Sequence, residues 1–114
     1  MILKHNGKTL ASQVVFAKNI FSQMLGLMFR KNISQKFAMI FILKKPITMG
    51  VHMLFMRFPI DTIFLDEDKK IVGIETLKPW VGHKRMKRVK YLIEMNKGIA
   101  EQFGLKIGDI ISFD

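Results

Sequence analysis

The stretch HMLFMRFPIDTIFLDEDKK, residues 52–70, contains a run of β-favouring residues that leads into a charged segment. Residues 62–65 end that run, and a second β-rich run follows at residues 71–77. Residues 66–70 between them are all charged. Two such runs on either side of a polar segment are typical of a β-hairpin. The stretch therefore predicts a hairpin whose turn lies at residues 66–70.

The segments before this hairpin also favour strands. Asn6-Gly7 lies between short runs at residues 2–5 and 8–11, and this dipeptide tolerates the positive φ angles of a type I′ turn. A further short strand is predicted at residues 13–16. Residues 37–43 are a continuous apolar run, long enough for a buried strand and too short for most helices.

Two short helices are predicted as well. From residue 18 onward, apolar residues recur at the i, i+3, i+4 and i+7 spacing of one helix face. These residues are Phe21, Met24, Leu25 and Met28. Near the C-terminus, Asn96 is predicted to cap a second helix that stops at Gly104, and a last strand is predicted at residues 110–113.

Residues 84–95 alternate in the manner of a strand with one buried face. The residues predicted on the buried face are Val89, Tyr91, Ile93 and Met95. The same alternation puts the cations on two faces, Lys84, Arg88 and Lys90 on one and Arg85 and Lys87 on the other.

Together these elements predict an α+β, mainly β fold, a single compact β-sheet or barrel-like domain with two short helices. A chain of 114 residues is close to the usual size of one domain. Residues 1–114 are therefore predicted to form a single domain.

The composition excludes several classes of chemistry. The chain has no cysteine, which rules out disulfides, thiolate metal sites and cysteine nucleophiles. It contains no phosphate-binding glycine loop, HExxH motif or GxSxG motif, and no cofactor or metal is predicted. The N-terminus lacks a signal-peptide pattern and no long uncharged run occurs, so we expect a cytoplasmic protein without membrane insertion.

Three separated motifs, in order along the chain, carry a resemblance to a known family. They are GLMFR at residues 26–30, PIDTIFLDEDKKIV at 59–72 and YLIEMNKGIAEQFGLKIGD at 91–109. The chain resembles the DUF192 family, also called UPF0127, which comprises small proteins of archaea and bacteria. The resemblance implies a compact β-rich domain with one or two helices and no established activity or cofactor. His52 departs from the family pattern, which often has an aromatic residue there.

A cluster of soft side chains lies around residue 52. Met49, His52, Met53 and Met56 carry thioether and imidazole groups that suit Cu(I). Methionine is also an adaptable filler of protein cores, and nine methionines are spread along the chain. Core packing is the favoured interpretation.

Asp61 is the candidate polar centre. On a regular strand Asp61 and Asp66 would point to opposite faces about 16 Å apart, so they are not predicted to act as a catalytic pair. Asp61 is predicted instead to accept hydrogen bonds from backbone amides or to pair with Arg30 or Arg57. The predicted ligand-binding residues are Arg30, His52, Met53, Phe55 and Asp61.

The segment KPWVGHKRMKRVKY, residues 78–91, has six Lys or Arg residues and no acid, in a chain with a formal net charge of +10. Positive charge beside aromatic side chains is typical of nucleic-acid binding. The candidate residues are Trp80, Lys84, Arg85, Lys87, Arg88 and Lys90. The favoured alternative is a solvated edge strand that its lysines protect from aggregation.

These observations leave three functional hypotheses. The leading hypothesis is a non-catalytic domain that binds a small ligand or a protein partner. The alternative is nucleic-acid binding through residues 78–91. The third is an enzyme of unidentified class that uses Asp61 with Arg30 and His52, for which no nucleophile or cofactor site can be named. A concave pocket around Asp61, lined by Met53 and Phe55, would favour a ligand.

Overall fold

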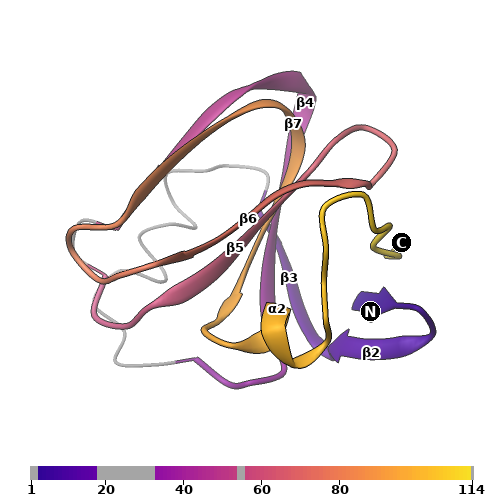
Figure 1. Ribbon diagram of the computed structural model, residues 1–114, viewed down its shortest axis with the longest axis horizontal. Helices are drawn as coiled ribbons and strands as arrows, with labels where there is room; N and C mark the ends of the chain where they lie inside the picture. Colours follow the sequence, from indigo (N-terminus) through magenta and orange to yellow (C-terminus); the bar gives the residue numbers. More distant parts are fainter. Residues whose placement is uncertain (1–2, 18–32, 54–55, 114) are drawn as a thin grey trace.

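Seven strands and one short helix make up the part of the chain that the structure describes (Figure 1). The structure is a computed structural model, and it describes residues 3–17, 33–53 and 56–113. The strands are β1 (Leu3–His5), β2 (Lys8–Ala11), β3 (Gln13–Ala17), β4 (Phe37–His52), β5 (Ile60–Leu65), β6 (Ile71–Leu77) and β7 (His83–Asn96), and the helix is α2 (Ile99–Gln102). The predicted helix of Phe21, Met24, Leu25 and Met28 lies outside the described residues. Within those ranges no helix is long and apolar enough to cross a membrane.

Five of the strands form one open, mixed sheet. Their order is β3-β4-β7-β5-β6, in which β3 and β4 run parallel and the other neighbours run antiparallel. In the described part of the chain, the edge strands β3 and β6 do not pair with each other. A closed barrel requires hydrogen bonds between its first and last strands. The predicted mainly β domain is therefore confirmed, and the predicted barrel-like form is wrong.

Both predicted hairpins are present. Asn6 and Gly7, which join β1 to β2, have φ angles of 50° and 75°, the positive values of a type I′ turn. In the turn after β5, Oδ1 of Asp66 accepts hydrogen bonds from the backbone N–H groups of Asp68 at 2.9 Å and Lys70 at 3.0 Å. Each turn is held by neighbours in the sequence, which is why local patterns predicted both.

Strand β4 is longer than the apolar run at residues 37–43 predicts, because it continues beyond Pro46. The pairing with β7 skips residues 43–46, which bulge out of the ladder. That bulge accommodates a proline, which cannot donate a ladder hydrogen bond. Beyond it, residues 47–52 of β4 pair with residues 83–89 of β7. We call this two-stranded part the ribbon.

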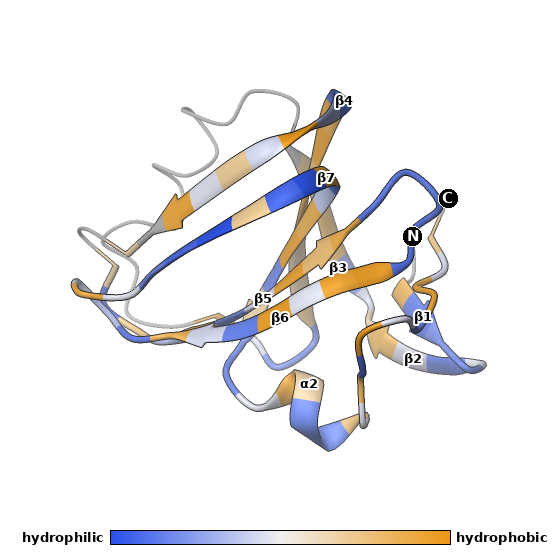
Figure 2. Cartoon of the chain, turned by 45° about the horizontal axis from the view of Figure 1, so that its top comes forward, coloured by the Kyte–Doolittle hydropathy of each residue, from blue (hydrophilic) through white to orange (hydrophobic). Residues whose placement is uncertain are grey.

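The sheet buries apolar side chains on both faces, because alternate residues of its central strands enter two different cores. The first core contains Phe41, Phe64 and Leu92, and the second contains Ile40, Ile63 and Ile93. Strand β5 is consequently buried along its whole length. The prediction that β7 has a single buried face is wrong, because Leu92 is as inaccessible as Ile93. Figure 2 shows apolar bands crossing the central strands, and a largely hydrophilic first half of β7.

The C-terminal segment covers the second core without forming the strand predicted at residues 110–113. It makes isolated bridges with Lys4 and with Lys70, which belong to separate parts of the fold. Nε2 of His5 and Oδ2 of Asp109 add a hydrogen bond of 2.9 Å. A segment that pairs briefly with two different partners cannot continue as a regular strand of either one.

A tight turn at residues 78–82 precedes the ribbon. The N–H of Gly82 donates to the carbonyl of Lys78 at 3.0 Å, and the N–H of Trp80 donates to the carbonyl of Met53 at 2.9 Å. A Cβ atom on Gly82 would lie 2.7 Å from both the backbone N and the backbone O of Lys78. Backbone atoms held in hydrogen bonds cannot yield to such a contact, so position 82 requires glycine.

We expect Gly82→Ala to lower the free energy of unfolding by about 1–3 kcal/mol, because the turn must open to admit the methyl group. Urea denaturation followed by circular dichroism measures this change. Gly50→Ala is the matched control, because Gly50 lies in the adjoining ribbon and nothing occupies the space within 4 Å of its Cβ position. Equal stability of the two variants would contradict the conclusion that position 82 requires glycine.

Candidate functional site

Asp61 is buried at the start of β5, with 1% of its surface exposed. Its Oδ1 accepts a hydrogen bond of 2.6 Å from Oγ1 of Thr76 on β6. Its Oδ2 accepts hydrogen bonds from the backbone N–H groups of Gly98 at 3.1 Å and Ala100 at 3.0 Å. The carboxylate therefore joins β5, β6 and α2. The prediction that Asp61 accepts hydrogen bonds from backbone amides is confirmed.

Asp61 caps α2 from a distant strand. The residue at the N-cap position is Gly98, which has a φ of 95° and no side chain to act as a cap. Asn96, the predicted cap, ends β7, and its Nδ2 donates to the carbonyl of Ile33 at 2.9 Å. The prediction of Asn96 was wrong because the helix begins later in the chain. A helix without a local cap needs an acceptor from elsewhere, and Asp61 supplies it.

A cleft of about 570 Å³ opens beside this cap, between β6, α2 and the segment that follows α2. Its lining combines apolar and charged side chains, among them Ile74, Leu105, Ile107, Lys97 and Lys106. Asp61 contributes to the wall, with both of its oxygens already bonded within the chain. The cleft is not the pocket predicted from the sequence, because Met53 does not line it.

Of the other predicted ligand-binding residues, the structure describes the backbone of His52 and the side chain of Met53. His52 pairs with His83, the first residue of β7, whereas Asp61 pairs with Met95, the last residue but one. The backbones of His52 and Asp61 therefore lie at opposite ends of β7. Met53 is 1% exposed within the first core. Arg30 and Phe55 lie outside the described residues. A ligand site built from this set stays a prediction.

The methionines near residue 52 pack in the core. Met49, Met53 and Met56 are at most 7% exposed, and all belong to the first core. Core packing, the favoured interpretation of these side chains, is confirmed. In the described ranges, no group of three or more His, Asp or Glu side chains could hold a metal ion.

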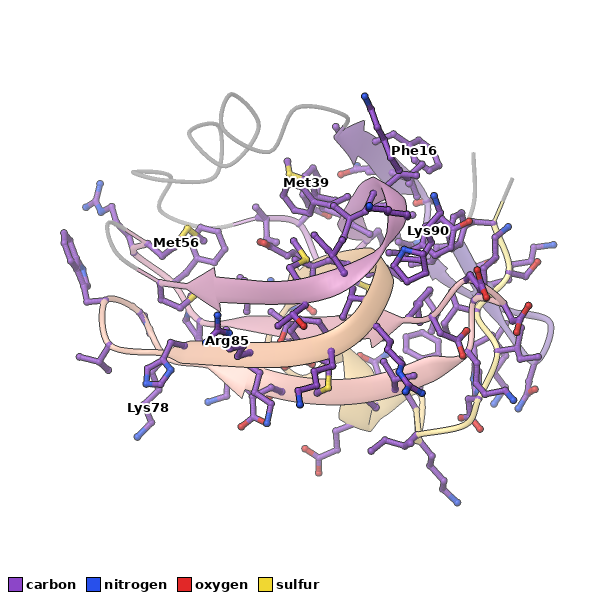
Figure 3. The ribbon with its side chains drawn as sticks, turned by 90° about the horizontal axis from the view of Figure 1, so that it is seen from above. Phe16, Met39, Met56, Lys78, Arg85 and Lys90 are labelled. Atoms are coloured by element: carbon purple, nitrogen blue, oxygen red, sulfur yellow. The ribbon has the colours of Figure 1, made fainter. Side chains whose placement is uncertain are left out.

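The ribbon presents a basic outer face. Thr48 and Gly50 are exposed on β4, and His83, Arg85 and Lys87 are exposed on β7. Arg85 is the direct partner of Gly50, whose missing side chain leaves the backbone open beside the guanidinium. A shallow groove of about 320 Å³ lies there, lined by residues that include Gly50, Thr48 and Arg85. Figure 3 shows Arg85 toward the end of the ribbon that adjoins Lys78 and the turn before β7.

A β-bulge adds a further cation to this face. The register shifts between Ile47 and Met49, so that Lys87 and Arg88 both lie opposite Thr48. Arg88 has a φ of 59°, and both basic side chains are exposed. The bulge therefore places two cations where a regular strand would place one.

The extra residue also overturns the predicted alternation of the basic segment. Met86 and Val89 are three residues apart, yet both pack against the first core. A regular strand would point them to opposite faces. Lys84, Arg88 and Lys90 therefore do not share one face.

Two of the predicted nucleic-acid-binding cations have partners within the chain. Nζ of Lys84 lies 3.7 Å from Oε2 of Glu75, and Nζ of Lys90 donates a hydrogen bond to the carbonyl of Leu43. Trp80 is 50% exposed in the turn before the ribbon. Among the described residues, no carboxylate forms an ion pair with the remaining candidates, Arg85, Lys87 and Arg88.

A cluster of three acidic residues lies far from the turn at residues 78–82. Asp66, Glu67 and Asp68 all lie in the turn between β5 and β6. Figure 1 shows that turn and the C-terminus on one side of the molecule and the turn at residues 78–82 on the opposite side. The basic surface is thus separated from the main acidic one, which favours the approach of a polyanion to the ribbon.

Glu94 lies at the centre of the sheet, between Met39 of β4 and Thr62 of β5. It is 3% exposed, and its Oε1 has no hydrogen-bond partner in the described part of the chain. The hydroxyl of Thr62 donates instead to the carbonyl of Glu75 at 2.8 Å. Burial disfavours the charged form and raises the pKa of Glu94 from 4.5 to about 7.

Sequence reasoning missed Glu94 and Gly50. The predicted strand at residues 84–95 placed Glu94 on its solvated face. A single acid inside the apolar run YLIEM was an available signal of a buried carboxyl. For Gly50 the signal was a glycine inside a strand, which often marks a place where another backbone or a ligand approaches.

We expect Asp61→Ala to lower the free energy of unfolding by about 3 kcal/mol or more, because three donors lose a charged acceptor. Asp61→Asn should cost less, about 1–2 kcal/mol, because its remaining oxygen can still accept from the two amides. Urea denaturation without any added ligand measures both changes. Glu67→Ala, which removes an exposed acid, is the control and should change stability by about 0.5 kcal/mol at most. Asp61→Ala with the stability of that control would contradict the capping role.

Glu94→Gln should change how stability depends on pH. Below pH 4.5 the folded and unfolded forms both hold the Glu94 proton, and between pH 4.5 and about 7 only the folded form does. As the pH rises through this window, the free energy of unfolding of the unmodified protein therefore falls relative to that of the Gln variant. The total fall, reached above pH 7, is up to about 3 kcal/mol. Urea denaturation of both proteins from pH 4 to pH 8 measures the difference. A constant difference across that range would show that Glu94 titrates normally.

Comparisons with known proteins place the chain in a family. The family model of DUF192, described as “Uncharacterized ACR”, matches residues 1–113. A UPF0127 protein of Pyrococcus furiosus is 38% identical over 110 residues, which are 95% of this chain and 92% of that protein. A UPF0127 protein of Thermococcus sibiricus is 32% identical over 116 residues, covering 100% of this chain and 74% of that protein.

Two crystal structures have the same fold. A protein of unknown function from Novosphingobium aromaticivorans gives a TM-score of 0.84 at 23% identity, covering 98% of this chain and 82% of that one. A protein from Sinorhizobium meliloti described as a candidate transcription regulator gives a TM-score of 0.82 at 23% identity, covering 97% and 89%. At this identity the likeness shows the fold alone. The family match and the similar UPF0127 proteins show that this chain belongs to the DUF192 family.

Proposed function

We propose that the protein binds nucleic acid, as a polyanion, through the outer face of the ribbon. The observation that carries the proposal is the groove over Gly50, with Arg85 directly beside it and two more exposed cations at the bulge. We call Arg85, Lys87 and Arg88 the groove cations. They occupy one surface and have no acidic partner among the described residues.

Phosphate groups fit this surface. The guanidinium of an arginine can donate two parallel hydrogen bonds to one phosphate, and a lysine adds a point charge. Gly50 leaves the strand backbone open, because nothing lies within 4 Å of its Cβ position. A nucleic-acid backbone can therefore approach the ribbon closely between the cations. A two-stranded β-ribbon also has the width that the major groove of a duplex admits.

The charge of the whole molecule supports the same partner. The formal net charge is +10, and the acids between β5 and β6 lie on the side opposite the turn that starts the ribbon (Figure 1). Such separation attracts polyanions over a longer range than single contacts do. The description of the Sinorhizobium meliloti protein, which shares the fold, as a candidate transcription regulator also accords with the proposal.

Binding of a small ligand or a protein partner is the second candidate function. The cleft beside Asp61 favours it, because about 570 Å³ lies within the range of ligand pockets. The cleft supports a ligand less strongly than the groove supports a polyanion. Its most buried polar group, the carboxylate of Asp61, is already occupied by Thr76 and the amides of α2.

We expect the protein to bind labelled oligonucleotides with little dependence on base sequence and a strong dependence on salt. Replacing the groove cations together, as Arg85→Ser, Lys87→Ser and Arg88→Ser, should make the slope of log affinity against log salt shallower. The change should be about 2 for single strands and about 3 for duplexes, because three phosphate contacts are lost. Fluorescence anisotropy over a salt series measures both slopes.

The matched control is the triple variant Lys4→Ser, Lys8→Ser and Lys36→Ser, which removes the same charge from exposed positions outside the ribbon. A second variant, Gly50→Glu, puts a carboxylate into the groove without steric conflict and should weaken binding more than Gly50→Ala does. If both triple variants lose the same affinity for the oligonucleotides, net charge alone attracts the polyanion. No binding at physiological salt would leave the ribbon as a solvated edge.

A further inference from the structure

The turn at residues 78–82, which directly precedes β7, carries two exposed apolar side chains. Trp80 is 50% exposed and Val81 is 73% exposed. His83, the first residue of β7, follows directly and lies about 7 Å from Arg85 along the same face, since a strand rises about 3.3 Å per residue. His83 and Arg85 both line the groove, so the exposed Trp80 lies in the turn that leads into one end of it.

The backbone at Trp80 is in an uncommon conformation. Its φ is 67°, in the left-handed region that bulky residues rarely adopt. Four non-glycine residues in the described ranges have positive φ, and two of them, Asn6 and Lys69, lie in ordinary hairpin turns. The other two are Trp80, in the turn before β7, and Arg88, at the bulge within β7. Strain of this kind persists where surrounding contacts hold it, and it is common at binding sites.

The surrounding hydrogen bonds fix this conformation. The N–H of Trp80 donates to the carbonyl of Met53, a residue buried in the first core, and the N–H of Gly82 donates to the carbonyl of Lys78. The N–H of Met53 donates in turn to the carbonyl of Gly82 at 3.0 Å, so two hydrogen bonds join the turn to Met53. The aromatic side chain is thus presented from a rigid turn, so little conformational entropy is lost when a partner stacks on it.

We propose that the ribbon takes single-stranded nucleic acid, with one base stacked on the indole of Trp80 and the adjoining phosphates on the groove cations. This inference rests on the proposed function and narrows its substrate class. In a duplex the bases are stacked on one another and paired, so an exposed aromatic side chain has no base face to contact. In a single strand every base offers such a face, and stacking of this kind tolerates any sequence.

The chain contains a single tryptophan, so intrinsic fluorescence reports on Trp80 alone. We would titrate the protein with oligothymidylate, with a duplex of equal length, and with an abasic strand that keeps the phosphates but lacks the bases. Quenching is expected with oligothymidylate only. All three should bind through the groove cations, as anisotropy of labelled strands would show.

The variant Trp80→Ala should weaken oligothymidylate binding about 5- to 150-fold, the range that corresponds to about 1–3 kcal/mol of base stacking. Binding of the duplex and of the abasic strand should change less than about twofold, because they use phosphate contacts only. Trp80→Phe keeps an aromatic surface and should retain most of the single-strand affinity. Circular dichroism confirms that both variants are folded.

Four results would overturn the inference. Unchanged oligothymidylate affinity in Trp80→Ala, or equal quenching by the abasic strand, would remove the stacking role while leaving the proposed function in place. A blue shift of Trp80 fluorescence with vesicles of anionic lipid, without quenching by oligothymidylate, would assign the turn to a membrane surface. Absence of binding to all three nucleic acids would reject the proposed function together with the inference.

Discussion

The carboxylate of Asp61 is the contact on which the arrangement of β5, β6 and α2 depends. A helix as short as α2, residues Ile99–Gln102, is not stable alone and cannot satisfy its own first N–H groups. Asp61 supplies the acceptor from β5, and Thr76 holds the other oxygen from β6. With α2 fixed in this way, Ile99 and Ala100 pack into the second core. Both the covering of that face and the cleft beside the cap follow from this one buried carboxylate.

Burial of both faces of the sheet determines where charge can lie. The central parts of β4, β5 and β7 have no solvated side, so cations there would lose their hydration without compensation. Most basic residues of β7 lie instead in the ribbon, whose inner side packs Met49, Val51 and Val89 in the first core and whose outer side is exposed. Bulges at residues 43–46 and at Arg88 mark the transition between sheet and ribbon. Bulges increase local twist and redirect side chains, which here brings the groove cations to a single exposed surface.

Glu94 is the described residue that conflicts most clearly with the packing of the sheet. A carboxyl between Met39 and Thr62, with one oxygen unpartnered among the described residues, makes the fold less stable at neutral pH than an apolar residue would. Two further departures are the positive φ angles of Trp80, in the turn before the ribbon, and of Arg88, in the ribbon itself. Departures from packing rules and backbone preferences tend to collect at functional positions. The proposed interface uses the side chains of both strained residues.

The sequence by itself determined the features whose causes are local. Asn6-Gly7 and Asp66 form their turns with near neighbours, and the apolar run at residues 37–43 needs no partner to be identified as a buried strand. The sequence also determined that Asp61 would accept backbone hydrogen bonds, but not from where. Its partners lie 37 and 39 residues away, and only the fold brings them together. The register of β4 against β7 likewise decided that Lys87 and Arg88 both lie opposite Thr48, and the two cores decided that Glu94 is buried. Such features depend on which distant strand lies alongside, and a pattern within one segment carries no information about its partner.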